Sequence, residues 1–284
     1  MIDCTCDSNA IRILPGLVAH GGYCDLYRGE MEGKGPVALK SLRTLDTPEK
    51  LNRLLRRETE VWHHLEHPNI LEFYGVYHHE SLDYLVSPWI PNGDLLTYLK
   101  SHPQIDRKAM VLEIAGALEY LHKKEVVHGD VKSKNILVSS SGRPLLCDFG
   151  LSKILDRARS RTPTEIQGAG SLRWSAPEFL IDQPDGRSKT KAGDVFAFGF
   201  VTIEVYTGRI PFYEYNDSSV LAFLLCGKRP ERPLDMDGVV WKLTRKCWPT
   251  NPSSRPTMRT ICQMLRLPFE IFQRRVTRSV AHTL

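Results

Sequence analysis

The pattern of hydrophobic and polar residues divides the chain into two unlike halves, and the pattern of the first half predicts strands. Residues 11–45 contain short apolar runs interrupted by a glycine pair and by the sequence GKGP at 33–36, which is typical of strands joined by tight turns. A single helix is predicted between Thr47 and His67, because its apolar residues share one helical face. Two further strand-like runs follow at 70–77 and 83–90.

The second half of the chain is predicted to be helical. Beyond a turn at 91–93, apolar residues recur at helical spacing in the segments 95–100, 106–123, 194–207, about 218–225, 236–247 and 256–265. Strands first and helices later predict an α+β fold, in which a small antiparallel sheet with one helix joins a larger helical lobe. The connection between the two lobes is expected near residues 88–92.

Composition and charge argue against several classes of protein. The longest nearly apolar run, 195–203, is too short to cross a membrane, and the N-terminal residues lack the basic-then-apolar pattern of a signal peptide. The net charge of +5 comes from dispersed basic residues, so nucleic-acid binding is not predicted. The seven scattered cysteines fit free thiols in a reducing compartment. We therefore expect a cytoplasmic, monomeric protein.

The strand-like sequence VALK at 37–40 supplies the first candidate for chemistry. Strand alternation places Ala38 and Lys40 on one face, where the lysine could bind a phosphate and the alanine would leave room for a flat ring. Glu58 falls within the apolar stripe of the predicted helix, so it needs a counter-charge, and Lys40 is the obvious partner. The alternatives are a solvent-facing lysine and a glutamate at the edge of the stripe that reaches water.

Two later segments place polar side chains next to apolar runs. The sequence HGDVKSKNILV at 128–138 contains Asp130, Lys132 and Asn135, which cannot be buried cheaply without partners. The strand-like sequence LLCDFG leads into Asp148, which together with Asn135 offers the oxygen ligands that Mg²⁺ prefers. A plain turn is the alternative for the Asp-Phe-Gly sequence.

These segments occur in the order found in eukaryotic-type protein kinases, which the chain resembles. The matching sequences are VALK, the helical glutamate, HGDxxxxN, DFG, SAPE at 175–178, DVFAFG at 194–199 and RPT at 255–257. The resemblance is nearest to the tyrosine-kinase-like serine/threonine branch and spans most of the chain. It implies an N-terminal extension at 1–13, a kinase domain at 14–268 with an N-lobe at about 14–90 and a C-lobe at about 91–268, and a tail at 269–284.

The resemblance also implies roles for individual residues. Asp130 would accept or orient the proton of the substrate hydroxyl, and Lys132 would steady the γ-phosphate of ATP. Asn135 and Asp148 would hold Mg²⁺, and Lys40, paired with Glu58, would bind the α- and β-phosphates. The other implied ATP-binding positions are Val18, Gly21, Leu26, Ala38, Ser87, Pro88, Ile90 and Leu137. The implied structural positions are Glu178 paired with Arg255, to fix the activation segment, and Asp194, to anchor the loop around Asp130.

Two departures from the family pattern affect the expected activity. The glycine-rich loop carries Ala19 and Cys24 at its first and third glycine positions, and a positive φ at either would cost about 1 kcal/mol or more. Gly129 replaces the arginine that binds an activation-loop phosphate in the family. Activity is therefore expected to depend little on phosphorylation of the loop at 148–178.

The resemblance implies a signalling enzyme that uses ATP and Mg²⁺ to phosphorylate serine and threonine in protein substrates. Lys132, two residues after Asp130, is the serine/threonine arrangement, and the segment 170–178 lacks the proline that typically shapes a tyrosine-accepting pocket. The alternative is a pseudokinase that binds nucleotide or acts as a scaffold, and the altered glycine loop favours it.

Overall fold

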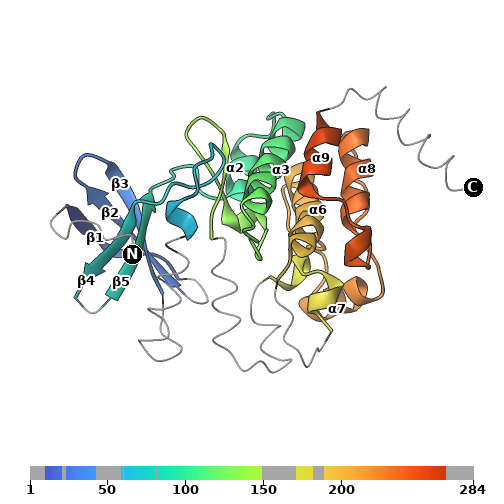
Figure 1. Ribbon diagram of the computed structural model, residues 1–284, viewed down its shortest axis with the longest axis horizontal. Coiled ribbons are helices and arrows are strands. Elements are labelled where there is room, and N and C mark those ends of the chain that lie inside the picture. The colour runs from blue at the N-terminus through green and yellow to red at the C-terminus, as the bar shows by residue number, and fades with distance from the viewer. Residues whose placement is uncertain are drawn as a thin grey trace, which may run out of the picture.

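The computed structural model describes residues 10–20, 24–42, 59, 61–80, 82–148, 171–181 and 189–266. Figure 1 shows a sheet built from the N-terminal residues and a larger group of helices built from later ones. The predicted α+β fold, with a small sheet lobe and a larger helical lobe, is confirmed. Within the described residues, no helix combines the length and apolar character needed to span a membrane.

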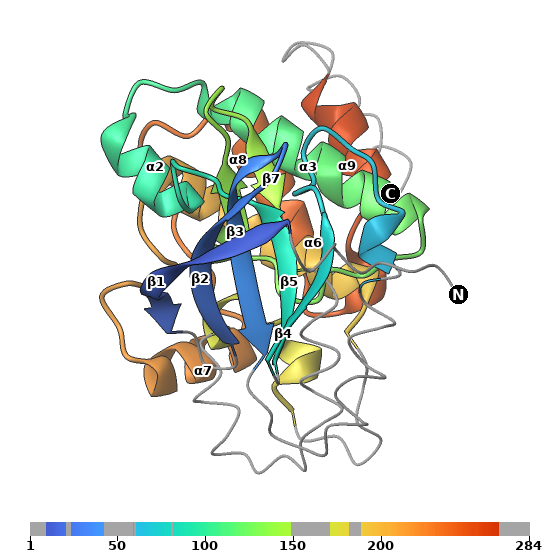
Figure 2. The same cartoon turned by 90° about the vertical axis from the view of Figure 1, so that its left-hand side faces the viewer.

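Five antiparallel strands form the N-terminal sheet, in the order β1-β2-β3-β5-β4. Their bounds are β1 Ile11–His20, β2 Cys24–Met31, β3 Gly35–Leu42, β4 Gly75–His79 and β5 Leu82–Pro88. Figure 2 looks onto this sheet, with the helices behind it. The strands predicted within 11–45 and 83–90 are therefore confirmed.

The strand predicted over 70–77 is only partly right. β4 begins at Gly75, whereas Ile70 forms a separate parallel bridge with Leu146. The Leu71 amide strengthens this contact by donating to the Leu146 carbonyl at 2.9 Å. This stretch therefore connects the sheet lobe to the helical lobe, through a long-range pairing that a local pattern cannot show.

Alternation along β3 separates the core of the sheet lobe from its opposite face. Val37, Leu39 and Ser41 are buried on one face, and the two apolar residues join the small core of this lobe. Ala38 and Lys40 lie on the other face and are half-buried, as the two-residue period of a strand requires. The prediction that Ala38 and Lys40 share a face is confirmed.

The helix predicted between Thr47 and His67 is described only in part. Thr59 and residues 61–63 are helical, and the Trp62 indole donates to the Leu71 carbonyl at 2.8 Å. Most of this helix, including Glu58, lies outside the described residues.

The described residues form six further α-helices, in the order that the sequence predicts, and a short hairpin. The helices are α2 Leu95–Ser101, α3 Arg107–Lys123, α6 Lys191–Thr207, α7 Asp217–Leu225, α8 Gly238–Cys247 and α9 Met258–Leu265. The hairpin consists of β6 Ile136–Val138 and β7 Pro144–Leu146.

Side-chain caps set where these six helices begin. In each, the residue before the first turn accepts a hydrogen bond from a backbone amide of that turn. The capping residues are Asp94, Asp106, Thr190, Asn216, Asp237 and Thr257. The Thr190 cap explains why α6 begins at Lys191, rather than at Asp194 as predicted.

Helix α6 forms the centre of the helical lobe, between α3 and α8 (Figure 1). All of its residues from Gly193 to Val205 are buried, so it has no solvent-facing side, as expected of an apolar helix in the core of a large domain. Its two acidic residues, Asp194 and Glu204, are buried with it. Buried carboxylates need hydrogen-bond partners, and both find them in the candidate site.

Candidate active site

The loop at 128–135, which we call the catalytic loop, holds Asp130 between two donors. Lys132 Nζ lies 2.8 Å from Asp130 Oδ2, and Asn135 Nδ2 donates to the same oxygen at 2.9 Å. A single 3₁₀ turn at Ser133–Asn135 brings the asparagine back to the aspartate just before β6 begins. The structure therefore brings together the three polar residues that the sequence singles out in this loop.

Asp130 is ionised at neutral pH. Burial raises the pKa of its carboxyl, but the charge of Lys132 and hydrogen bonds from Lys132 and Ser171 outweigh burial, so the pKa lies below its usual value. The buried neighbour His128 accepts a hydrogen bond from the Asp130 amide through Nδ1 at 3.2 Å. Asp130 is thus a fixed carboxylate that can accept a hydrogen bond from a hydroxyl group.

Lys40 and Asp148 meet across the two lobes. Lys40 Nζ on β3 lies 2.6 Å from Asp148 Oδ1, which follows the end of β7. Burial lowers the pKa of the Lys40 ammonium, but the Asp148 carboxylate outweighs burial and raises it, so Lys40 stays charged. The predicted partner Glu58 lies outside the described residues.

Asn135 and Asp148 have the chemistry of magnesium ligands. The Asn135 amide nitrogen donates to Asp130, which leaves its side-chain oxygen available for a cation. Lys40 contacts Oδ1 of Asp148, and Oδ2 is a second potential ligand. Both residues supply the hard oxygen atoms that Mg²⁺ prefers, so the side chains fit this ion, and their use as ligands stays a prediction.

Four of the predicted ATP-binding positions lie on one face of the sheet. Strand register places Leu26 opposite Lys40 and Ala38 opposite Ser87. Because cross-strand partners share a face, these four side chains lie on the same side of the sheet. The other described positions are Val18 on β1, Pro88 at the end of β5, Ile90 just beyond it and Leu137 on β6. Their contact with a nucleotide stays a prediction.

The two altered glycine positions, Ala19 and Cys24, carry less backbone strain than the sequence suggests. Gly21 lies outside the described residues, but Ala19 belongs to β1 and Cys24 to β2. The described non-glycine residues with positive φ do not include Ala19 or Cys24. The conditional cost of about 1 kcal/mol for losing these two glycines therefore does not apply.

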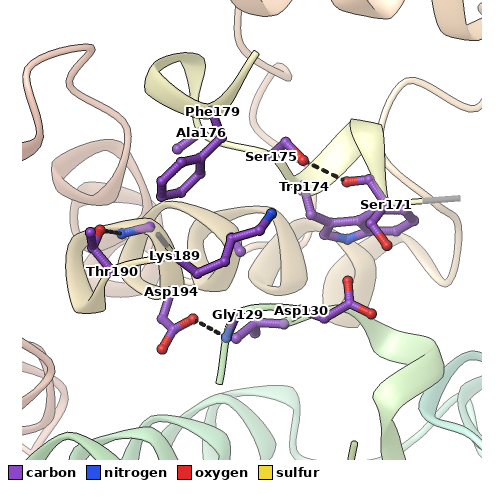
Figure 3. Close-up of a pocket in the computed structure, with 13 residues that line it drawn as sticks. Gly129, Asp130, Ser171, Trp174, Ser175, Ala176, Phe179, Lys189, Thr190 and Asp194 are labelled. Carbon is purple, nitrogen blue, oxygen red and sulfur yellow. Dashed lines mark hydrogen bonds between the residues drawn. The ribbon is translucent and has the colours of Figure 1, made fainter. Parts of the chain in front are cut away.

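Asp194 holds the catalytic loop from α6. Its carboxylate accepts hydrogen bonds from the His128 and Gly129 amides, both at 2.8 Å, and lies 2.9 Å from His122 Nε2. The structure thus places Asp194 where the predicted anchoring role requires it. Figure 3 shows the bond to Gly129.

Gly129 adopts a backbone conformation that favours glycine, with φ of 79°. We expect Gly129→Ala to lower the free energy of unfolding by about 1–2 kcal/mol, the cost of a left-handed conformation for a residue with a Cβ atom. Urea unfolding measures this difference. Gly116→Ala in α3 is the matched control, because a Cβ atom there meets nothing within 4 Å and φ is not positive, so it should not destabilise. Equal stability of Gly129→Ala and wild type would contradict this account of the loop.

The segment at 171–181 lies across a small cavity from the catalytic loop. Lys132 Nζ donates to Ser171 Oγ at 2.7 Å, so one ammonium group bridges Asp130 and this segment. Figure 3 shows Ser171 and Trp174 of the segment on one side of the cavity and Asp130 on the other. The cavity itself is only about 20 Å³ in volume. The segment therefore lies next to the Asp130 carboxylate.

A buried ion pair fixes the end of this segment. Arg255 binds both carboxylate oxygens of Glu178 at 2.7 Å, and the arginine side chain is completely buried. The two residues are in contact as the sequence-based pairing requires. Bidentate pairs of this kind are stronger and more directional than a single charged hydrogen bond.

Glu204 joins the catalytic loop to the segment at 171–181. Its carboxylate accepts hydrogen bonds from the Ser133 hydroxyl at 2.5 Å, the Ser133 amide at 3.1 Å and the Trp174 indole at 2.8 Å. Burial raises the pKa of Glu204 to about 7, despite the hydrogen bonds that lower it. One buried carboxyl on α6 therefore orients both sides of the candidate site.

The raised pKa of Glu204 predicts a specific pH dependence of stability. The folded protein holds the Glu204 proton more tightly than the unfolded chain, so stability is lost as the pH rises from about 4.5 to about 7. A shift of this size corresponds to up to about 3 kcal/mol. Glu204→Gln should remove that slope, which urea unfolding at several pH values would measure. The exposed Glu231→Gln should keep the wild-type slope, and parallel curves for Glu204→Gln and wild type would rule out this role for Glu204.

Several residues that hold this site were not predicted. Glu204 had a sequence signal, because it directly follows the longest apolar run of a helix too apolar to reach solvent. His122, Ser133, Ser171 and Trp174 have no comparable local signal. Their importance comes from long-range partners that only the fold reveals.

Known proteins match most of the chain. The family model described as protein tyrosine and serine/threonine kinase matches residues 15–265. "Probable serine/threonine-protein kinase kinX" of Dictyostelium discoideum is 30% identical over 256 residues, which are 88% of this chain and 23% of that protein.

Two further relatives have names that specify different amino acids. "Serine/threonine-protein kinase CTR1" of Arabidopsis thaliana is 32% identical over 260 residues, 88% of this chain and 30% of that protein. "Tyrosine-protein kinase transforming protein Abl" of Abelson murine leukemia virus is 32% identical over 260 residues, 88% of this chain and 33% of that protein. The chain thus spans about a quarter to a third of the length of these relatives.

Proposed function

The chain belongs to the protein tyrosine and serine/threonine kinase family, and we propose that it transfers the γ-phosphate of ATP to serine and threonine hydroxyls of protein substrates. The observation that carries this proposal is the contact of Lys132 with both Asp130 and Ser171, at 2.8 and 2.7 Å. It sets a fixed carboxylate and a fixed ammonium beside the segment at 171–181. An acceptor hydroxyl and a transferred phosphate need these two charges at the same point.

Each residue has a separate part in the proposed reaction. Asp130 accepts the hydrogen bond of the incoming hydroxyl and orients it, while Lys132 balances negative charge on the phosphate oxygens. Lys40 binds the phosphates from the sheet lobe. Asn135 and Asp148 hold Mg²⁺, which supplies charge neutralisation of the phosphates when bound.

Two features support serine and threonine over tyrosine as acceptors. The Lys132 bridge keeps Asp130 close to Ser171, so a short acceptor side chain can reach the carboxylate. The segment at 171–181 also lacks the tyrosine-kinase proline before its SAPE sequence. We further propose that this kinase depends little on activation-loop phosphorylation, because Gly129 has no side chain to bind a phosphate.

The test is a transfer assay with radiolabelled ATP, Mg²⁺ and a generic basic protein substrate, followed by identification of the labelled amino acid. Label on phosphoserine and phosphothreonine is expected. Label only on phosphotyrosine would contradict the proposed specificity. Nucleotide binding without any transfer would support the pseudokinase alternative.

Nucleotide binding is expected to be linked to metal. If Asn135 and Asp148 hold Mg²⁺, ATP should raise the melting temperature more with Mg²⁺ than with EDTA. At a hundredfold excess over Kd, ATP stabilises the folded state by about 2.7 kcal/mol, which is a measurable thermal shift. Asp148→Asn should reduce the difference between the two conditions, whereas the exposed Asp235→Asn should not. Equal shifts with and without metal would exclude these ligands.

A further inference from the structure

A second cavity, of about 680 Å³, opens in the helical lobe between α3, α6 and the start of α9. Figure 1 shows these three helices side by side. The lining of this cavity does not include Asp130, Lys132 or Asp148, so it is distinct from the candidate active site. Its volume lies in the range of about 300–1,000 Å³ that is usual for ligand pockets.

The cavity has an apolar floor and a basic rim. Ala192 and Pro256 form the accessible apolar part of the floor and are half-buried, whereas Val195 and Met258 are almost fully buried. Lys123 on α3 and Arg259 on α9 lie at the rim and are exposed. Glu119 is the one acidic residue among the described residues that line it.

Some of the basic side chains in the lining already have partners. Lys191 lies 2.7 Å from Glu125, and the side chains of His122 and Arg255 bind carboxylates of α6 and of the segment at 171–181. These three residues are therefore compensated within the chain.

Lys123 and Arg259 are not compensated in this way. Across the described ranges, neither side chain forms an ion pair or a hydrogen bond. Both are exposed, so neither charge carries a desolvation cost, and each remains available to an incoming anionic group. Two available cations therefore flank an apolar depression on the surface of the helical lobe.

We propose that this cavity binds an acidic peptide segment of a partner protein, with an apolar side chain between its acidic residues. The apolar side chain would cover Ala192 and Pro256, and the carboxylates would meet Lys123 and Arg259. A lone inorganic anion would leave the apolar floor in water, and a basic peptide would be repelled by the rim. The site does not depend on phosphotransfer, so it stands apart from the proposed function.

Three pools of fluorescein-labelled peptides test the charge preference. All have the same length and a central Leu-Phe pair, and all lack serine, threonine and tyrosine so that they avoid the acceptor site. Their flanking positions are drawn from Asp and Glu, from Asn and Gln, or from Lys and Arg. Fluorescence anisotropy should show the acidic pool binding at least about tenfold more tightly than the Asn/Gln pool, with affinity falling as salt is added.

Paired charge reversals locate the binding site. Lys123→Glu with Arg259→Glu should weaken binding of the acidic pool by at least about tenfold. Arg245→Glu with Lys246→Glu is the matched control, because these exposed residues at the end of α8 carry the same charge change and do not line the cavity. The control should bind as wild type does, and melting temperatures check that both variants are folded.

The apolar part of the proposal has its own test. An acidic pool with Ala-Ala in place of Leu-Phe should bind at least about tenfold more weakly. Three results would each overturn the proposal. The two acidic pools could bind equally well, the two charge-reversal variants could lose binding equally, or the acidic and Asn/Gln pools could have equal affinity. Displacement of the acidic pool by inorganic phosphate at equal concentration would also overturn it, because the site would then select an anion alone.

Discussion

Replacing Asp130 by asparagine should lower the turnover number by about 10²–10⁴-fold, the usual contribution of a positioned general base. The asparagine cannot take a proton, and its amide group would face the donors Lys132 and Asn135 that the carboxylate now accepts from. The Kd for ATP should stay nearly unchanged, because the proposed role of Asp130 is to bind the acceptor hydroxyl and not the nucleotide. Steady-state kinetics and an independent nucleotide-binding measurement separate the two effects.

Asp235→Asn is the matched control for this change. It removes the same charge at an exposed position outside the candidate site, so turnover should stay at the wild-type value. A purified Asp130→Asn protein that phosphorylates as fast as wild type would refute the role given to Asp130. A parallel loss of ATP affinity would instead show that the variant disturbs the whole site.

Local sequence signals predicted most of the fold because the residues that begin and end its helices and strands lie next to them in the sequence. Capping side chains such as Asp106 and Thr257 stand at the helix starts that the apolar spacing indicates. The alternation of VALK correctly placed Ala38 and Lys40 on one face. The strand predicted over 70–77 was only partly right, because Ile70 pairs with Leu146, which is distant in sequence.

The candidate site was predicted where one short motif holds the chemistry, and missed where the chemistry depends on distant partners. Asp130 and Asn135 are five residues apart, and a single turn joins them. The Lys132 contact with Ser171 and the Glu204 contacts with Ser133 and Trp174 each join elements that are far apart in the sequence. The spacing of hydrophobic residues does not predict such contacts, so the polar network beneath the site can be seen only in the folded structure.

Gly129 shows how a structure changes the interpretation of a sequence departure. In the sequence, Gly129 stands where the family has an arginine, and the expected consequence of losing that arginine concerns regulation. In the structure it is a residue with φ of 79° whose amide is fixed by Asp194 at 2.8 Å. A glycine there avoids the backbone strain that a larger residue would carry, so the same substitution also stabilises the loop that holds Asp130.

Replacing Arg255 by methionine should lower the free energy of unfolding by about 3–5 kcal/mol, the usual cost of removing one partner of a buried ion pair. The completely buried guanidinium group binds both oxygens of Glu178, and it also donates to the carbonyls of Pro249, Ala192 and Thr250. Methionine fills part of the space but donates to none of these acceptors. The Glu178 carboxylate would then be left buried without a counter-charge, and urea unfolding measures the loss.

Two further variants separate the ion pair from the general loss of a side chain. Lys191→Met removes a cation from a pair with the exposed Glu125 and should cost less than about 1 kcal/mol. Glu178→Gln combined with Arg255→Met should be less destabilising than the sum of the two single changes, because no uncompensated charge remains in the double variant. Transfer activity should fall with Arg255→Met, since Glu178 closes the segment that also carries Ser171 and Trp174. If the effects of the two single changes add up to that of the double change, the pair is not coupled, and the segment must be held by the carbonyl contacts of Arg255 instead.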